Sequence, residues 1–407
     1  MTATSRPNER DERRRGNQVL HKKEADVVVL GGGPAGCAAT LELARRRCSV
    51  VVIERSEYAE LRIGETLPPM ARKIMADLGL WNRFVSEEHL PSFGISSVWG
   101  RDEVYENDFI FNPYGAGWHV DRARFDAWLA RCAEEVGATV YRGAQLTSWA
   151  SDAAGGWEIE IGRGAEQLCY RTRFLIDASG RAASFARKQG AQRTVFDHLI
   201  GAAAFLSASA RSPRPNSLTL VEAVEQGWWY SAAVPNAQLV AAYFTDADLY
   251  AKRNRNSATQ WWERLQQARH TKARAKGHAL SDGPFILAAN SSRLDPVVGS
   301  NWLAVGDAAM AFDPLSSQGV STALEFGLRA AKSIQAHLQG GARALVDYAQ
   351  AVRQSFENYL RVRDRYYGRE QRWPHSAFWR RRHSNSITGA LATSGEGDHS
   401  NEPNQES

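Results

Sequence analysis

A glycine-rich turn near the N-terminus has the residue types and spacing to bind a pyrophosphate. The apolar run of three valines and a leucine at 27–30 enters Gly31-Gly32-Gly33-Pro34-Ala35-Gly36, which fits the pattern G-x-G-x-x-G. The first glycine of this pattern permits a tight turn, the second lets backbone N–H groups approach the phosphates, and the third lets a helix pack against the strand. The N-terminus of that helix adds unpaired N–H groups and a positive dipole end. The sequence therefore predicts ligand contacts at Gly31, Gly33, Pro34, Ala35 and Gly36.

A carboxylate follows this turn at the distance that a dinucleotide site requires. A second apolar run, at 50–53, ends at Glu54. An acid about 20 residues beyond the glycines can accept hydrogen bonds from an adenosine ribose. Strand, turn, helix, strand and acid occur in the order of a βαβ unit, which favours a dinucleotide site over a chance glycine-rich loop. Only one such pattern is present, so we expect no separate nicotinamide-binding domain and a reductant that is either transiently bound NAD(P)H or another donor.

Composition narrows the class of protein further. The chain has 407 residues, 43% hydrophobic and 23% charged, which is typical of a globular protein with two or three lobes. No apolar run approaches the roughly 18 residues of a membrane-spanning helix. The polar segment 1–23 lacks the apolar core of a secretory signal, so the predicted location is cytoplasmic, without membrane attachment.

Charge and cysteine usage argue against two other kinds of site. The net charge is +5, and basic runs lie at 13–15 and 380–382. No nucleic-acid-binding motif accompanies them, so we expect solvated ends or docking to an acidic protein surface rather than nucleic-acid binding. The four cysteines have no short metal-ligand spacing, and no metal site is predicted.

Four separated signatures share one order along the chain. They are the glycine turn with Glu54, the V-x-R-x-x-F-D run at 120–126, the turn from Asp177 to Gly180, and Gly306-Asp307 followed by Pro314 and Gly319. In this order they resemble the FAD-dependent monooxygenases and halogenases with a glutathione-reductase-like FAD domain. The resemblance covers most of residues 25–380.

That resemblance implies an α/β fold with a glutathione-reductase-like Rossmann FAD-binding domain, an inserted mixed β-sheet substrate lobe and C-terminal helices. The implied boundaries are 24–91, 119–194 and 291–338 for the FAD-binding domain, 92–118 and 195–290 for the substrate lobe, and 339–388 for the helical segment. Segments 1–23 and 389–407 are expected to be disordered ends.

The resemblance also implies FAD as cofactor, molecular oxygen as co-substrate, and a set of flavin contacts. Asp307 would bond the ribityl chain, and the loop 314–319 would lie against the isoalloxazine. The helix after the loop would point its N-terminus at the flavin N1/C2 carbonyl, where it favours the anionic reduced flavin. Further FAD contacts are expected at Arg62, Gly64, Glu65, Arg122, Asp177, Gly180, Gly306, Gln318, Gly319 and Val320. The alternatives are a helix-surface role for Arg122 and a helix-capping role for Glu65.

Hydroxylation and halogenation are distinguished by a few positions. Tryptophan halogenases have a lysine that carries the activated halogen and a loop similar to Pro-Leu-Glu-Ser-Thr-Gly. Here the loop has Ser316 at the glutamate position and Gln318 at the halide-contacting threonine position. No lysine occurs at 89–96, upstream of Trp99, and the W-x-W-x-I-P motif is only echoed at 227–235. The sequence therefore favours hydroxylation.

Several runs are similar to one branch of the monooxygenases, those that hydroxylate a tryptophan residue of another protein during biogenesis of a cysteine tryptophylquinone cofactor. The runs lie at 64–69, 97–100, 112–119 and 227–231. The implied reaction is transfer of oxygen from a flavin C4a-hydroperoxide to an indole, a post-translational modification. The implied partner is a protein substrate, free or held on another maturation enzyme, that docks over a wide mouth of the second lobe near the basic segment 361–382.

Candidate catalytic residues follow from this branch. Pro314 lies in the loop 314–319, the flavin loop. The rings of Trp228, Trp229 and Tyr230, with Trp99 and Trp118, would stack near the indole, and His119 would assist proton transfer. Core packing of these rings and a structural role for the histidine are the alternatives. A polyprenyl reductase-like enzyme and a non-catalytic flavoprotein also remain open.

Overall fold

The computed structural model describes residues 22–384 except 154, 210–215, 236 and 252–257. The predicted disordered ends therefore lie outside the described residues, apart from Lys22 and Lys23, and the first strand already begins at Lys23. Among the described helices, none combines the length and apolar character needed to cross a membrane.

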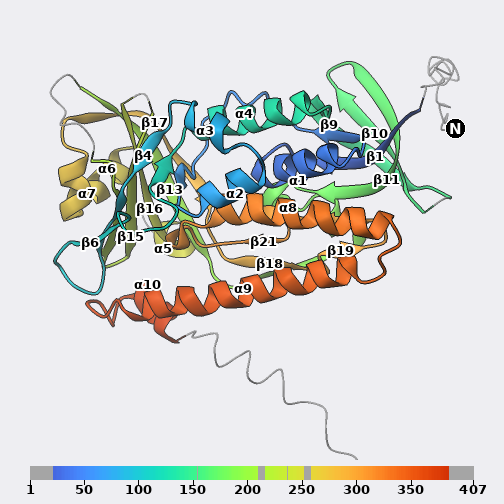
Figure 1. The fold of residues 1–407 in the computed structure, drawn as a ribbon. Coiled ribbons are helices and arrows are strands. Elements are labelled where there is room, and N and C mark those ends of the chain that lie inside the picture. Colours follow the sequence, from blue (N-terminus) through green and yellow to red (C-terminus); the bar gives the residue numbers. More distant parts are fainter. Residues whose placement is uncertain (1–21, 154, 210–215, 236, 252–257, 385–407) are drawn as a thin grey trace, which may run out of the picture.

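A parallel sheet forms the core of the first unit (Figure 1). Its parallel strands lie in the order β20-β11-β1-β2-β8. Val27, Val28 and Val29 are fully buried, as expected for a parallel strand covered on both faces. Antiparallel strands β19, β9 and β10 extend this sheet. The bounds are β1 (Lys23–Leu30), β2 (Val50–Ile53), β8 (Thr139–Tyr141), β9 (Ala144–Ser151), β10 (Trp157–Arg163), β11 (Glu166–Asp177), β19 (Val298–Gly299) and β20 (Trp302–Ala304).

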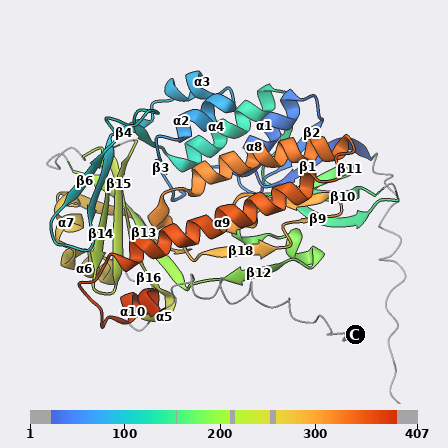
Figure 2. The ribbon, with the colours of Figure 1, turned by 60° about the horizontal axis from the view of Figure 1, so that its bottom comes forward.

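Long helices pack beside this sheet. Helix α1 (Pro34–Arg45) lies alongside α8 (Gly319–Leu338), and α9 (Ala344–Gly368) runs along α8 on its other side (Figures 1 and 2). Helix α4 (Arg122–Glu135) also packs on α1, and the short helices α2 (Ala71–Asp77) and α3 (Trp81–Val85) follow the first βαβ unit. Asp121 caps α4 by accepting a hydrogen bond from the Arg124 amide.

A seven-stranded sheet forms the second unit. Its order is β17-β13-β16-β15-β14-β5-β6, and all neighbours are antiparallel except β14 and β5. The sheet is mixed, as expected, and combines strands from both predicted lobe segments. The bounds are β5 (Gly94–Val98), β6 (Tyr105–Asp108), β13 (Leu199–Ala208), β14 (Thr219–Val224), β15 (Gly227–Val234), β16 (Gln238–Asp246) and β17 (His278–Ala288).

The two faces of this sheet meet different partners. On one face, Trp229 and Tyr243 pack with Trp261 of α6 (Ala258–Gln267), next to α7 (Arg269–Arg274). On the other face, Trp228 and Phe244 pack with the end of α9 and with α10 (Ala377–Ser384). The short helix α5 (Ala247–Ala251) comes directly after β16 and contacts it. Helix α9 thus contacts both units.

Two three-stranded sheets connect the units. One has the order β3-β7-β4 and the other β12-β18-β21. The bounds are β3 (Thr66–Leu67), β4 (Leu90–Ser92), β7 (Gly117–His119), β12 (Gln192–Val195), β18 (Ser292–Asp295) and β21 (Met310–Ala311).

Half of the arginines in the basic C-terminal segment are paired within the protein. Arg382 Nη2 lies 2.8 Å from Asp246 Oδ1, and Arg381 Nη1 lies 2.7 Å from Asp248 Oδ1. Arg363 is paired with Asp197 at 2.8 Å, and Arg372 with Asp102 at 2.7 Å. These four of the eight arginines at 361–382 stabilise the C-terminal helices against the rest of the protein, and the other four make no ion pair with a described residue.

We predict that Gly327→Ala destabilises the protein by about 1–3 kcal/mol, although alanine favours helix more than glycine does. A Cβ at Gly327 would lie 2.5 Å from Ala35 O and 2.7 Å from Ala38 Cβ, so α1 and α8 would have to separate. The control is Gly368→Ala at the end of α9, where a Cβ meets nothing within 4 Å. Urea unfolding should show a loss for the first variant only; equal midpoints for both would contradict this packing.

Candidate functional site

The glycine turn adopts the geometry that the sequence predicts. Gly31 has φ of 109°, and a Cβ there would collide with Ala178 O. A Cβ at Gly36 would collide with Gly31 O, which explains the third glycine. At Gly33, by contrast, a Cβ would meet nothing within 4 Å. The turn is thus tight on its inner side and open in front of the α1 N-terminus, where an anion would bind.

Glu54 is held against this turn. Its Oε2 accepts a hydrogen bond of 2.7 Å from the Gly32 amide, and its Oε1 accepts one of 2.9 Å from the Ser56 amide. The Tyr58 hydroxyl donates to Gly32 O at 2.8 Å. No sequence motif indicates Tyr58, because its contact depends on a left-handed backbone at φ of 60°.

Arg62, Gly64 and Arg122 come together around one buried carboxylate. Arg62 Nη1 donates to Asp126 Oδ2 at 2.8 Å, and Arg122 Nε donates to Asp126 Oδ1 at 3.2 Å. Arg122 Nη1 also donates to Gly64 O at 3.3 Å. Arg122 therefore fixes the turn before Glu65 and is not a helix-surface arginine.

Asp307 lies in a turn between α1 and α8. A Cβ at Gly306 would lie 2.7 Å from Ala35 Cβ and 3.7 Å from Ala323 Cβ, so this turn contacts both α1 and α8. The Asp307 side chain stays partly exposed, with Oδ2 3.6 Å from Arg181 Nε. A carboxylate at this place can accept hydrogen bonds from a hydroxylated chain that runs between the helix N-termini.

The structure corrects the expectation for the Asp177 carboxylate. It is fully buried, and it accepts hydrogen bonds from the amides of Ser179, Phe185 and Ala186 at 3.0, 2.9 and 2.8 Å. Because no part of it faces open space, it shapes the 177–186 turn and makes no direct ligand contact. Gly180 in that turn does border open space.

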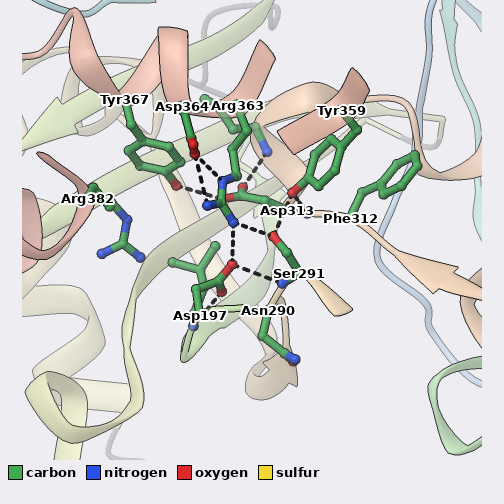
Figure 3. Close-up of polar contacts among 12 residues, drawn as sticks. Asp197, Asn290, Ser291, Phe312, Asp313, Tyr359, Arg363, Asp364, Tyr367 and Arg382 are labelled. Carbon is green, nitrogen blue, oxygen red and sulfur yellow. Dashed lines mark hydrogen bonds and ion pairs between the residues drawn. The ribbon is translucent and has the colours of Figure 1, made fainter. Parts of the chain in front are cut away.

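The loop 313–319 is fixed from behind by Asp313 (Figure 3). Asp313 Oδ1 accepts a hydrogen bond from the Leu315 amide at 2.9 Å, and Oδ2 accepts one from the Tyr367 hydroxyl at 2.7 Å. Its own amide donates to the Tyr359 hydroxyl at 2.7 Å. Burial, reinforced by the charge of Asp197, raises the pKa of Asp313 to about 6. Sequence analysis did not name Asp313, although an aspartate before proline is a recognised capping signal.

The residues of the flavin loop border open space on the side that faces away from Asp313. Pro314 begins a short 3-10 turn (Pro314–Ser316), and Gln318 immediately precedes α8. A Cβ at Gly319, the first residue of α8, would meet nothing within 4 Å, and Val320 packs against the core. The first amides of α8 therefore point into unfilled space, as those of α1 do.

Glu65 is one end of a buried polar cluster. It is almost fully buried, its Oε2 accepts a hydrogen bond of 2.8 Å from the Gly64 amide, and burial raises its pKa. The nearby Tyr230 hydroxyl is 2.6 Å from Thr66 Oγ1, and burial raises the pKa of Tyr230 as well. These two groups support the β3 strand under the site.

His119 does not have the predicted proton-transfer role. It is fully buried, and its Nε2 lies 3.1 Å from Thr219 Oγ1. Burial, with the charge of Arg274 adding to it, lowers the pKa of His119 to about 3. The imidazole therefore stays neutral at physiological pH and is a structural residue between β7 and β14.

The two adjacent tryptophans point to opposite faces of the second sheet. Trp228 is fully buried, stacks on Phe244 with a centroid distance of 4.2 Å, and donates to the Tyr367 hydroxyl at 3.0 Å. Trp229 packs on Trp261 on the far face. Neither ring borders the cleft beside the flavin loop, where the predicted stacking on an indole would occur. Trp229 borders a second cleft, of about 860 Å³, on the far side of the sheet. Tyr230 is also buried, and Trp118 packs with Phe84 in the first unit.

Trp99 is the predicted aromatic residue that borders the cleft beside the flavin loop. The cleft has a volume of about 1,030 Å³ and is open to solvent on one side. Its walls come from β5 and β6, the flavin loop and α9, and they include Ile95, Trp99, Tyr105, Leu315, Gln318 and Tyr366. Trp99 Nε1 donates to Tyr366 O at 2.8 Å, which joins two walls. The described lining contains no lysine, histidine or carboxylate.

The family model for an FAD binding domain matches residues 24–361. The chain belongs to this FAD-binding-domain family. It is therefore a flavin-dependent, oxidoreductase-type enzyme. In the open space before α1 and α8, the α1 N-terminus would hold the pyrophosphate of FAD, with Glu54 near the ribose and Asp307 near the ribityl chain.

Named relatives fall into more than one group. The putative FAD-dependent oxidoreductase LodB of Marinomonas mediterranea is 30% identical over 366 residues, which cover 88% of this chain and 97% of LodB. A 1H-pyrrole-2-carbonyl-[peptidyl-carrier protein] brominase of Pseudoalteromonas luteoviolacea is 29% identical over 330 residues, covering 78% of this chain and 79% of the brominase.

Solved structures confirm the α/β fold. The myxobacterial chondrochloren halogenase CndH superposes with a TM-score of 0.81 at 22% identity, covering 92% of this chain and 91% of CndH. The peptidyl tryptophan dihydroxylase QhpG superposes with a TM-score of 0.71 at 24% identity, covering 88% of this chain and 78% of QhpG. At these identities the likeness shows the fold and leaves the reaction open; the predicted kinship to the tryptophan-hydroxylating branch in particular is not confirmed.

We predict that Gly33→Ala weakens FAD binding about tenfold or more while leaving the apoprotein stable. The added methyl group fits the backbone, because φ is −76° and no atom lies within 4 Å, but it occupies the path of the phosphate. Gly31→Ala should instead destabilise the fold by about 2 kcal/mol or more, because of its positive φ and the collision with Ala178. FAD fluorescence titration and apoprotein melting separate the two effects; wild-type FAD affinity in Gly33→Ala would place the phosphates elsewhere.

The raised pKa of Asp313 predicts a pH-dependent stability. Its ordinary value is 3.8 and its folded value is about 6, so the folded protein retains a proton that the unfolded chain releases. The contribution of Asp313 to the free energy of unfolding is greatest below about pH 4 and is lost as the pH rises through about 6. The loss amounts to about 2–3 kcal/mol. Urea unfolding from pH 4 to 7 should show this decline in wild type relative to Asp313→Asn. Parallel pH curves for the two proteins would refute the assignment.

Proposed function

We propose that this chain is an FAD-dependent monooxygenase that hydroxylates an indole ring, namely that of a tryptophan residue in a protein substrate during tryptophylquinone maturation. The observation that carries the proposal is the composition of the cleft beside the flavin loop. It is aromatic, open to solvent, and without lysine or carboxylate among its described residues.

The absence of these groups bears directly on the reaction. Reduced FAD with molecular oxygen supplies an electrophilic oxygen, and such transfer to an electron-rich ring requires positioning and exclusion of water rather than a protein nucleophile. Halogenation of the tryptophan-halogenase type requires a lysine that carries the halogen. No lysine borders the cleft in the described part of the chain, and Ser316 and Gln318 border it where that family has glutamate and threonine.

The residues of this chain have three tasks in the proposed reaction. The amides at the start of α8 favour negative charge at the flavin edge. Asp313 holds the loop that carries Pro314 and Leu315 against that edge. Trp99, Tyr105 and Leu315 provide flat apolar surface on which an indole can lie.

The size of the cleft and its open side favour a substrate that is part of a protein. A volume of about 1,030 Å³ with an open side exceeds what one indole fills. The QhpG similarity supports the same substrate class, whereas the brominase and CndH similarities favour halogenation as the second candidate.

We expect oxygen, and no halogen, to be added to the substrate. The test incubates the holoenzyme, a reductant for FAD and ¹⁸O₂ with the precursor of a tryptophylquinone enzyme, in buffer containing both chloride and bromide. Peptide mass spectrometry should show ¹⁸O on a single tryptophan, and none when that tryptophan is replaced by phenylalanine. A chlorine or bromine isotope pattern would establish halogenation instead, and an unmodified substrate with rapid peroxide release would contradict both reactions for this substrate.

A further inference from the structure

The outer edge of the second sheet next to the cleft is not paired with any described strand. Strand β6 is the last strand of the seven, and all four of its residues are exposed. The Phe109 amide donates to Phe93 O at 2.8 Å, so the backbone groups of Tyr105, Asn107 and Phe109 point toward β5. Those of Glu106 and Asp108 therefore point toward the open edge. The short length of β6 and its two acidic side chains disfavour self-association, but the outward backbone groups can pair with a complementary chain.

The same strand forms a wall of the cleft. Tyr105 and Asn107, two residues apart on one face of β6, both line it. A strand added beyond β6 would lie about 4.8 Å away and would direct every second side chain to that same face. One such side chain would enter the cleft beside Leu315 and Gln318, which belong to the flavin loop.

Exposed apolar side chains lie at the end of the open edge. Ile110 is 74% exposed and Phe111 is 95% exposed, directly after β6. Phe93, whose carbonyl pairs with Phe109, is also exposed. Contiguous exposed apolar groups beside a cleft are typical of a contact surface for another chain.

Two arginines at the cleft have no carboxylate partner among the described residues. Arg101 stacks over the Tyr105 ring at 5.3 Å, and Arg369 stacks over the Tyr366 ring at 5.4 Å. Both line the cleft, whereas the third cleft arginine, Arg363, is paired with Asp197. Stacked and unpaired guanidinium groups favour acidic side chains on the incoming segment.

We propose that an acidic, extended segment of the protein substrate pairs with the free edge of β6 as an eighth strand and thereby places its tryptophan in the cleft. The inference rests on the proposed function for the identity of that side chain. Acidic residues two positions before and after the tryptophan would share its face and meet Arg101 and Arg369. Pairing of β6 with β6 of a second copy is disfavoured, because Glu106 and Asp108 of both copies would lie on one face.

The direct test measures binding of a defined peptide to the holoenzyme by fluorescence anisotropy. The probe is an end-blocked peptide of about ten residues, a length of about 33 Å when extended, with a central tryptophan, glutamate two positions to either side, and threonine elsewhere. Glu106→Pro removes an outward N–H but no backbone hydrogen bond to β5, and should weaken binding about tenfold. Both Glu106 variants lose the 3.2 Å hydrogen bond that Ser96 Oγ of β5 donates to Glu106 Oε1, so Glu106→Ala controls for that loss. Glu106→Ala keeps that N–H and should bind within about twofold of wild type.

Peptide variants test the same contact without changing the enzyme. N-methylation at the amides that face β6 should abolish binding, whereas N-methylation at the alternate amides should not. Replacing glutamate by lysine should weaken binding about tenfold at low salt, and this preference should disappear in Arg101→Ala/Arg369→Ala. The docking proposal is overturned if both Glu106 variants bind equally well, if the position of the N-methyl groups has no effect, or if the lysine peptide binds as tightly as the glutamate peptide.

The outcome also separates docking from chemistry. Oxygen insertion into the peptide with equal rates in Glu106→Pro and wild type would refute docking on β6 and leave the monooxygenase proposal intact. Edge-dependent binding without any oxygen insertion would support docking and refute the proposed reaction for this peptide.

Discussion

The close approach of α8 to α1 is the constraint on which the site depends. It is possible because Gly327 has no side chain where α8 meets Ala35 and Ala38. Gly319, the first residue of α8, lies eight residues before Gly327, which is a rise of about 12 Å along α8. The contact at Gly327 therefore fixes where the α8 N-terminus lies relative to α1. Gly306 fits between Ala35 and Ala323, and thus places Asp307 in that interval. Two helix N-termini and one carboxylate are therefore spaced by backbone packing, which is what an elongated cofactor with a phosphate end and a flavin end requires.

The buried hydrogen bonds of Asp313 are a second constraint, because they hold the flavin loop in place on its protein side. Residues from four separate segments meet there, including Asp197, Ser291, Tyr359 and Arg363 (Figure 3). Tyr359 and Tyr367 are eight residues apart on α9, so one helix holds the loop at two points. Because Trp228 donates to the same Tyr367 hydroxyl, the packing of the second sheet is coupled to the position of the loop.

Local motifs predicted much of the fold and indicated the residues of the candidate cofactor site. The glycine turn, Glu54 and the Gly306-Asp307 pair could be recognised because each depends on a few neighbouring residues with a strict steric or electrostatic requirement. Trp228, Trp229 and His119 could not be assigned in this way. The role of a strand residue depends on which face of the sheet meets which element, and for Trp228 that element is α9, about 140 residues later in the chain. The donors around the Asp177 carboxylate likewise lie partly at 185–186, outside the motif.

We expect one FAD to lie along α1 and to reach the start of α8, with its ring facing the cleft between β6 and α9. A crystal structure of the protein with FAD should show density for the pyrophosphate at Gly33, for the ribityl chain at Asp307, and for the isoalloxazine edge at the amides of Gly319 and Val320. Density for the flavin on the far face of the second sheet, beside Trp229, or an isoalloxazine turned away from the cleft, would contradict it.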